Sequence, residues 1–143
     1  MSQAEKEAIS VLTAAIGKKY VLTDQKSVEF YSMDVYRSFE TPIAVVQPGS
    51  VEELQEVVRV ATGLGIAIVT RGGGASYTDG YLATTPKSIT IDTSRLNKIV
   101  EINEEDMLVT VEPGVTWAAV SYTHLRAHET LRYLVCRLLL EKK

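Results

Sequence analysis

The first 120 residues of this 143-residue chain contain no histidine and no cysteine. His124, His128 and Cys136 all lie in residues 121–143. Hydrolases of the Ser-His or Cys-His type need an imidazole beside their nucleophile, so residues 1–120 give nucleophilic hydrolysis no support. The two histidines have zinc-ligand spacing, but the H-E-x-x-H order and a third ligand are missing, so we expect no metal site. Cys136 stands among leucines, which favours an inert thiol.

Long apolar runs and a basic excess are also missing. No stretch approaches the roughly 18 apolar residues that a membrane span needs. Residues 1–10 carry acids and lack the apolar core of a secretory signal, so we expect a cytoplasmic protein. The net charge of −3 offers no basic field for nucleic acid. The length suits one domain with a real core.

The composition changes sharply at residue 121. Residues 121–143 hold five Lys/Arg and two Asp/Glu, a net +3, which leaves −6 for residues 1–120. The leucines of this tail recur at helical spacing, whereas the preceding segment has a strand pattern. The tail is therefore expected to be a helix unrelated to the preceding domain.

What is present is a run of glycines, R-G-G-G-A-S-Y-T-D-G, from Arg71 to Gly80. Glycines lack a Cβ, so the backbone can take positive φ and approach a ligand closely. Successive N–H groups in such a turn can bind an anion such as phosphate. A plain tight turn is the structural alternative. The P-loop lysine after Gly80 and the third glycine of the dinucleotide G-x-G-x-x-G pattern are both missing, which excludes those two phosphate loops.

The residues before this loop predict a βαβ unit. The apolar runs 43–46 and 66–70 are typical of buried strands. Between them, Ser50 and Glu53 have capping-box spacing at the start of a helix expected over 50–63. The second strand thus delivers the glycine loop at its carboxyl end, where ligands usually bind in α/β sheets. The expected apolar stripe of the helix is Val51, Leu54, Val57, Val58 and Ala61.

Other elements are expected on both sides of this unit. Apolar spacing predicts a helix over 2–17. The following link has no clear pattern and offers Asp24 and Asp34 as turn residues. After the glycine loop, short β-type runs predict a small strand-rich lobe, and Thr116 is a possible cap of a further helix. These runs are 88–92, 99–102 and 107–112.

Together these motifs resemble a known family. Residues 28–120 are similar to the N-terminal part of the FAD-binding, PCMH-type domain of the vanillyl-alcohol oxidase/p-cresol methylhydroxylase superfamily. Glycolate oxidase D-subunits and D-lactate dehydrogenases are the members closest in style. The resemblance implies an α+β fold and rests on P-x-A-V-V-x-P-x-S-V-E-E-L at 42–54, the loop at 71–80, D-T-S-R-L-N-K-I at 92–99 and V-E-P-G-V at 111–115.

The resemblance also implies a cofactor site. In this family the glycine loop holds the FAD pyrophosphate through backbone N–H groups. The residues implied here are Arg71, Gly72, Gly73, Gly74, Ala75, Ser76, Tyr77 and Gly80. Many members link the flavin to a histidine just after the glycines, and Ala75 stands there, so non-covalent FAD is expected. The segment 92–96 is expected to be structural.

The resemblance does not extend over the whole chain. We expect a helical lead-in at 1–27, the N-terminal part of the FAD-binding domain at 28–120, and a non-native helical tail at 121–143. The family's second glycine segment and its substrate domain have no counterpart here. The implied parent is a flavin-dependent oxidoreductase that oxidises a small 2-hydroxy acid or related alcohol. The chain alone is expected to be a fragment without catalytic residues or turnover.

Two alternatives stay open at this point. One is a flavoenzyme of the kind that reduces an enolpyruvyl sugar nucleotide, and the other is a non-catalytic nucleotide-binding module. Tyr77, Tyr81 and Trp117 are able to stack on a flavin or adenine, but such residues more often pack in a core. Asp79 and the acids at 104–106 suggest acid/base chemistry only weakly, and the latter are expected in a solvated turn.

Overall fold

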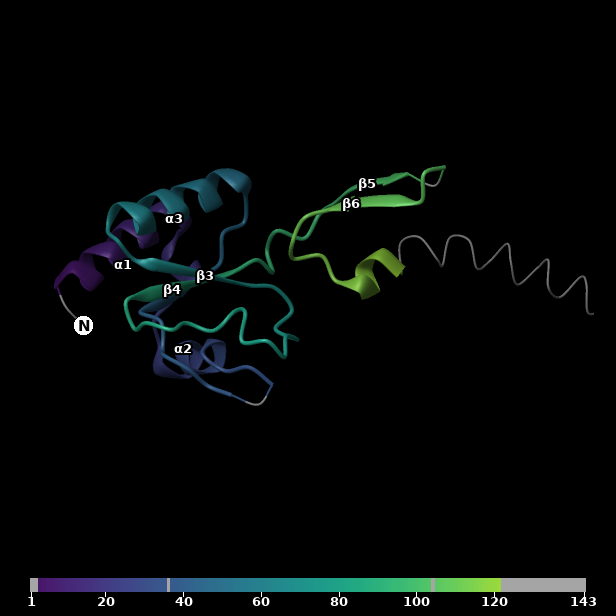
Figure 1. The fold of residues 1–143 in the computed structure, drawn as a ribbon. Helices are drawn as coiled ribbons and strands as arrows, with labels where there is room; N and C mark the ends of the chain where they lie inside the picture. Colours follow the sequence, from purple (N-terminus) through teal and green to yellow (C-terminus); the bar gives the residue numbers. More distant parts are fainter. Residues whose placement is uncertain (1–2, 36, 104, 122–143) are drawn as a thin grey trace, which may run out of the picture. The chain divides into compact units, whose positions relative to one another are not determined.

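A computed structural model describes residues 3–35, 37–103 and 105–121. The chain divides into two compact units, Met1–Leu96 and Asn97–Lys143, and each is considered by itself (Figure 1). The first unit contains α1 (Gln3–Ile16), a 3-10 turn (Lys18–Tyr20), β1 (Val21–Leu22), α2 (Gln25–Tyr31), β2 (Ala44–Val46), α3 (Val51–Gly63), β3 (Ala67–Arg71) and β4 (Ser88–Asp92). The second unit contains β5 (Ile99–Asn103) and β6 (Leu108–Val111).

The first unit is built on a four-stranded sheet with the order β1-β2-β4-β3. The strands β2, β4 and β3 run parallel, and β1 pairs antiparallel with β2. The predicted strand–helix–strand unit is confirmed, with β3 ending at the glycine loop. Because parallel strands share one carboxyl edge, the ends of β2, β3 and β4 lie together.

The strand expected at 88–92 is present, but it does not belong to a separate lobe. As β4 it lies between β2 and β3, pairing Ile91 with both Val46 and Thr70. All five of its residues are buried. A strand covered on both faces in this way is typical of a parallel sheet. Among the described residues, the strands that remain for the expected lobe after the loop are β5 and β6.

The helix α3 begins as its capping signals predict. Ser50 Oγ accepts a hydrogen bond from the Glu53 amide at 3.2 Å, and Glu53 Oε2 accepts one from the Gly49 amide at 2.7 Å. Its buried side chains are Val57, Val60 and Ala61. The predicted stripe was wrong at two positions, because Val51 and Val58 are exposed (54% and 38%).

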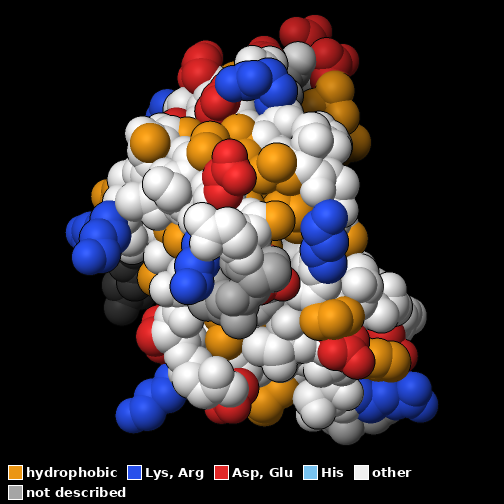
Figure 2. Space-filling view, turned by 90° about the vertical axis from the view of Figure 1, so that its left-hand side faces the viewer, with side chains coloured by type: hydrophobic (Ala, Val, Ile, Leu, Met, Phe, Trp, Pro, Cys, Tyr) orange, Lys and Arg blue, Asp and Glu red, His pale blue; other side chains and the backbone are white. Residues whose placement is uncertain are grey.

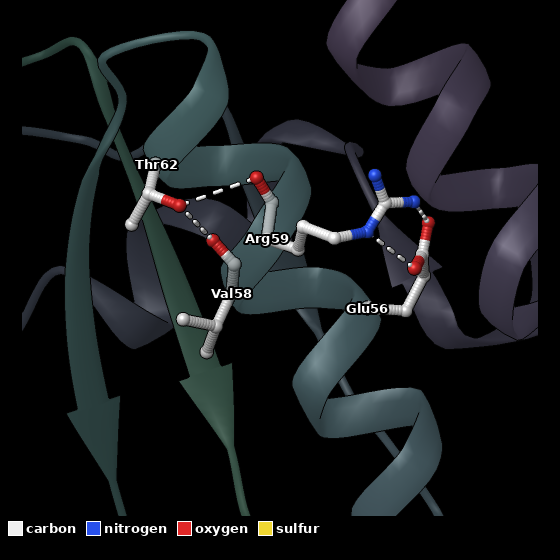
Figure 3. Close-up of polar contacts among 4 residues, drawn as sticks. All are labelled: Glu56, Val58, Arg59 and Thr62. Atoms are coloured by element: carbon white, nitrogen blue, oxygen red, sulfur yellow. Dashed lines mark hydrogen bonds and ion pairs between the residues drawn. The ribbon is translucent and has the colours of Figure 1, made fainter.

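The two errors have a geometric reason. Each helical residue advances by about 100°, so Val58 lies about 100° and Val51 about 120° from the buried Val57, at the margin of the core-facing side. The outer side of α3 carries polar contacts, as Figure 3 shows. Arg59 pairs with Glu56 at 2.5 and 3.0 Å, and the Thr62 hydroxyl donates to the Val58 carbonyl at 2.7 Å.

The helix α1 packs against α3. Its buried residues Ala8, Leu12 and Ile16 recur at four-residue spacing and join the core with residues of β2 and β4. Gly17 takes φ +89° directly after it, a conformation that favours glycine. The predicted helix at 2–17 and its stop are thus confirmed to within a residue.

The sequence did not predict α2 or β1. Asp24, expected in a turn, is the N-cap of α2, and its carboxylate accepts a hydrogen bond from the Ser27 amide at 3.0 Å. Only Val28 of this seven-residue helix is buried, so the apolar periodicity is too weak to read. The element matters because it brings Tyr31 to the sheet.

The second unit is a β-hairpin followed by the start of a helix. The strands β5 and β6 pair antiparallel, with Ile102 opposite Val109. Asn103 and Asp106 bond each other across the turn at 2.8 and 3.0 Å, so this acid has a turn role, as expected. Thr116 Oγ1 accepts the Ala119 amide at 3.3 Å, which confirms the predicted cap of the helix at 117–121.

The charges of the described residues are mixed in sign. Figure 2 shows Lys and Arg side chains interspersed with Asp and Glu side chains on one face. Within the described ranges, no helix has both the length and the hydropathy that crossing a membrane requires.

Candidate cofactor-binding site

The glycine loop, residues 72–80, leaves the sheet at the carboxyl end of β3. The sequence suggested positive φ across its three glycines, but of these only Gly74 has it, at +70°. A Cβ built on Gly74 would lie 2.7 Å from Arg71 Nη2, so no side chain fits there without moving Arg71. A Cβ built on Gly73 would meet nothing within 4 Å. Gly73 thus does not have positive φ, and it borders open space.

The main chain of the loop has unused donors. In the described part of the chain, the amides of Gly72, Gly73, Gly74 and Ala75 donate no hydrogen bond. Backbone N–H groups normally find a partner in the protein or in water. A series of free amides beside open space fits an anionic group with several acceptor oxygens, such as a pyrophosphate.

Arg71 supports the loop from inside. It is only 9% exposed, and its Nη1 donates to the carbonyls of Phe30 and Met33 at 3.2 and 3.1 Å. Its guanidinium lies 5.2, 5.0 and 4.8 Å from the rings of Phe30, Tyr31 and Tyr81. The cation expected at the loop entrance thus joins the end of α2 to the base of the loop.

Tyr81 holds the loop from its far end. This tyrosine is 7% exposed, and its hydroxyl lies 2.8 Å from the Gly74 carbonyl oxygen and 2.9 Å from Asp34 Oδ1. Burial and the Asp34 carboxylate raise the pKa of Tyr81. Burial opposes ionisation of Asp34, but hydrogen bonds from the Val35 amide and Tyr81 lower the pKa of Asp34 overall. At neutral pH the tyrosine therefore keeps its proton and the aspartate is charged.

The remaining predicted loop residues have different surroundings. The Ser76 hydroxyl accepts the Thr78 amide at 3.1 Å and lies 2.9 Å from the Thr78 hydroxyl, so it already has partners. Tyr77 is 68% exposed, and Gly80 is exposed. Asp79 takes φ +57° and pairs with Arg37 at 3.6 Å.

A second polar cluster, which we call the Asp92 cluster, lies where β2 and β4 end. Asp92 is 3% exposed and accepts hydrogen bonds from the Tyr31 hydroxyl (2.6 Å), Gln47 Nε2 (2.7 Å) and the Ser94 amide (2.9 Å). Burial alone would raise the pKa of Asp92, but these donors lower it. Burial, then the Asp92 hydrogen bond, raises the pKa of Tyr31 to about 12. The carboxylate and its three donors are hydrogen-bonded to one another, which agrees with the structural role expected for 92–96.

The sequence missed several residues that shape this edge. Tyr31 and Gln47 carried no signal, and Tyr81 was noted only as a stacking or core residue. The one usable sign was Asp92 at the end of an otherwise apolar, β-branched strand, because a buried carboxylate requires donors.

The remaining sequence candidates are the metal ligands, Cys136, the acids at 104–106 and Trp117. Within the described residues, no three His, Cys, Asp or Glu side chains gather closely enough to hold a metal ion. His124, His128 and Cys136 lie outside the described residues, as does Glu104. Trp117 is 81% exposed and belongs to the second unit.

Comparison with protein families matches the FAD binding domain model over residues 42–132. The matched range includes β2, α3, β3, the whole glycine loop, β4 and the hairpin. It also continues 12 residues past the boundary expected at 120.

Curated relatives include two dehydrogenases. A D-2-hydroxyglutarate dehydrogenase of Xanthomonas citri pv. viticola is 34% identical over 110 residues, covering 76% of this chain and 23% of the relative. A mitochondrial D-lactate dehydrogenase [cytochrome] of Kluyveromyces lactis is 29% identical over 96 residues, covering 66% of this chain and 17% of the relative.

Solved structures support the same fold. A p-cresol methylhydroxylase with substrate bound matches with a TM-score of 0.76 and 26% identity, over 90% of this chain and 26% of that one. The 4-ethylphenol oxidase from Gulosibacter chungangensis matches with a TM-score of 0.78 and 29% identity, over 89% of this chain and 25% of that one. The chain thus spans about a quarter or less of the length of these proteins.

Proposed function

Because this chain belongs to the FAD binding domain family, we propose that its glycine loop holds the pyrophosphate of FAD. The donors would be the main-chain amides of Gly72, Gly73, Gly74 and Ala75. The observation that carries this proposal is that these amides have no partner in the described chain while Gly73 borders open space. Tyr77, exposed beside them, and Gly80 would border the ligand, and Arg71 and Ser76 would hold the loop in shape.

The attachment of the flavin is proposed to be non-covalent. Ala75 occupies the position where many family members carry the linking histidine, and residues 1–120 contain neither histidine nor cysteine. Bound FAD would supply the redox chemistry by accepting a hydride from a substrate carbon. The residues described here would contribute binding and orientation of the cofactor.

The activity of the longer protein is proposed from its relatives. Those named D-2-hydroxyglutarate dehydrogenase and D-lactate dehydrogenase favour a small 2-hydroxy acid as the substrate. The similar p-cresol methylhydroxylase and 4-ethylphenol oxidase structures make a phenol the second candidate. We propose that the 143-residue chain alone does not turn over either, since catalysis also needs the substrate held against the flavin ring.

A pair of glycine variants tests the binding proposal. Gly73→Val would place a branched side chain in the open space beside the free amides, so FAD affinity should fall by at least a hundredfold. Gly63→Val is the matched control, because a Cβ on Gly63, at the end of α3, also meets nothing within 4 Å. Titration of FAD fluorescence gives both affinities.

The controls for this titration are simple. Circular dichroism should show that both variants fold like the parent chain, and acid precipitation should release the bound FAD into the supernatant. Equal FAD affinity for the Gly73 variant and the parent would remove the glycine loop from the proposed site.

A further inference from the structure

The carbonyl of Gly74 faces the interior of the first unit. Its oxygen lies 2.8 Å from the hydroxyl of the buried Tyr81. The described chain contains no cis peptide bond. In a planar trans peptide, the C=O of one residue and the N–H of the next point in opposite directions. The Ala75 amide must therefore point away from Tyr81, toward the outside of the loop.

This orientation needs a cause, because the local chain does not impose it. Gly74 has φ +70° and no Cβ, and a glycine allows the following peptide to rotate at little steric cost. Rotation by about half a turn would direct the Gly74 carbonyl outward and the Ala75 amide inward. An outward carbonyl would repel an anion that the outward amide would bind.

The contacts around Tyr81 favour one of these two orientations. Its ring lies 4.8 Å from the Arg71 guanidinium, which is itself fixed by two carbonyls of the segment 30–33. Its hydroxyl is also 2.9 Å from Asp34 Oδ1. The hydroxyl is thus held in place by groups outside the loop, and its single proton is shared between Asp34 Oδ1 and the Gly74 carbonyl oxygen.

We propose that Tyr81 is a positioning residue for the cofactor: its hydroxyl fixes the peptide between Gly74 and Ala75 so that the Ala75 amide faces the FAD pyrophosphate. The proposal rests on the proposed function of the glycine loop and deepens it. Tyr81 itself does not contact the cofactor. Without its hydroxyl, the peptide would adopt both orientations, and FAD would bind less tightly because binding would also have to fix the outward orientation of the amide.

The chain contains a matched control for this idea. Tyr31 and Tyr81 both give a hydroxyl hydrogen bond to a carboxylate, and both rings lie about 5 Å from Arg71. Only the Tyr81 hydroxyl contacts the loop. Substitution by phenylalanine keeps each ring and removes only the hydroxyl.

The experiment compares Tyr81→Phe with Tyr31→Phe in FAD titrations and in thermal unfolding without ligand. We expect Tyr81→Phe to weaken FAD binding about fivefold to tenfold, the equivalent of one hydrogen bond. Tyr31→Phe should change the FAD affinity by less than about twofold, although it should lower the melting temperature at least as much. Equal losses of affinity in the two variants, or no loss in Tyr81→Phe, would overturn the proposal.

A measurement on the unmodified chain keeps the proposal testable even if a variant does not fold. In ¹⁵N-labelled protein, the Ala75 amide should be among the resonances that FAD shifts most, and an unshifted Ala75 amide would contradict the positioning role. The Gly73→Val result separates the two proposals. If Gly73→Val abolishes binding and Tyr81→Phe has no effect, only the role of Tyr81 is wrong.

Discussion

Two tyrosine–aspartate pairs lie beside Arg71 at the end of β3, and they differ in whether the polar groups near them are all hydrogen-bonded. In the Asp92 cluster, Tyr31, Gln47 and the Ser94 amide all donate to one buried carboxylate. Around the glycine loop, Tyr81 joins Asp34 to a single carbonyl, and the amides of 72–75 have no partner among the described residues. The polar groups of the Asp92 cluster are hydrogen-bonded to one another, whereas the glycine loop leaves main-chain donors available for a ligand.

This difference separates stability from the proposed FAD binding at one edge of one sheet. A buried, fully bonded carboxylate holds α2, β2 and β4 together, because each donor comes from a different segment. The loop, by contrast, is held by the hydrogen bond between Tyr81 and Gly74 and by the ion pair between Arg37 and Asp79. Changes in the Asp92 cluster should therefore alter unfolding more than FAD affinity, and changes in the loop should do the reverse.

The largest effect on stability is expected for Asp92→Ala. The substitution removes a buried carboxylate and leaves the Tyr31 hydroxyl, the Gln47 amide and the Ser94 N–H without their acceptor, which should cost about 3–5 kcal/mol of unfolding free energy. Urea denaturation measures this loss. The control is Asp106→Ala, in the exposed hairpin turn, which should cost less than about 1 kcal/mol. Equal losses would show that the Asp92 cluster does not stabilise the sheet.

A smaller effect is expected for Gly74→Ala. The alanine would have to keep φ +70°, and its methyl group would have to displace the Arg71 guanidinium, at a cost of about 2 kcal/mol. Gly73→Ala is the matched control, with negligible expected change in unfolding free energy because its Cβ enters open space. Chemical denaturation of both variants measures the difference. A Gly73 variant as unstable as the Gly74 variant would contradict the loop geometry.

These expectations show what the sequence was able to predict. The start of α3 was predictable because its signals, Ser50 and Glu53, act within one helical turn. The position of β4 was not, since pairing with β2 and β3 depends on residues more than 15 positions away. Short helices such as α2, with a single buried side chain, leave almost no apolar pattern.

The site was predictable in part for the same reason. The glycine loop is a local motif and was identified with its bounds. The inward direction of Arg71 depends on carbonyls of Phe30 and Met33, about 40 positions earlier in the chain. The contact between Tyr81 and Gly74 likewise depends on how the loop closes, which no spacing rule encodes.

The smallest expected effect is a pH dependence of the stability that comes from the Tyr31–Asp92 pair. The pKa of Tyr31 is raised from 10.0 to about 12 in the folded chain. A raised pKa gives stability that is fully present below the unfolded value near 10 and is lost as the pH rises through 12. The unfolding free energy of the parent should therefore fall more steeply between pH 10 and 12 than that of Tyr31→Phe. Parallel curves would contradict the buried Tyr31–Asp92 bond.

The central claim, that the glycine loop binds the pyrophosphate of FAD, is tested most directly by comparing FAD with riboflavin, which has the same ring system and no phosphate. Fluorescence titrations of the parent chain and of Gly73→Val with both ligands give four dissociation constants. We predict that the parent binds FAD at least a hundredfold more tightly than riboflavin, and that Gly73→Val removes this preference without changing riboflavin binding. A parent chain that binds both ligands equally, or a Gly73 variant that keeps the preference for FAD, would contradict the claim.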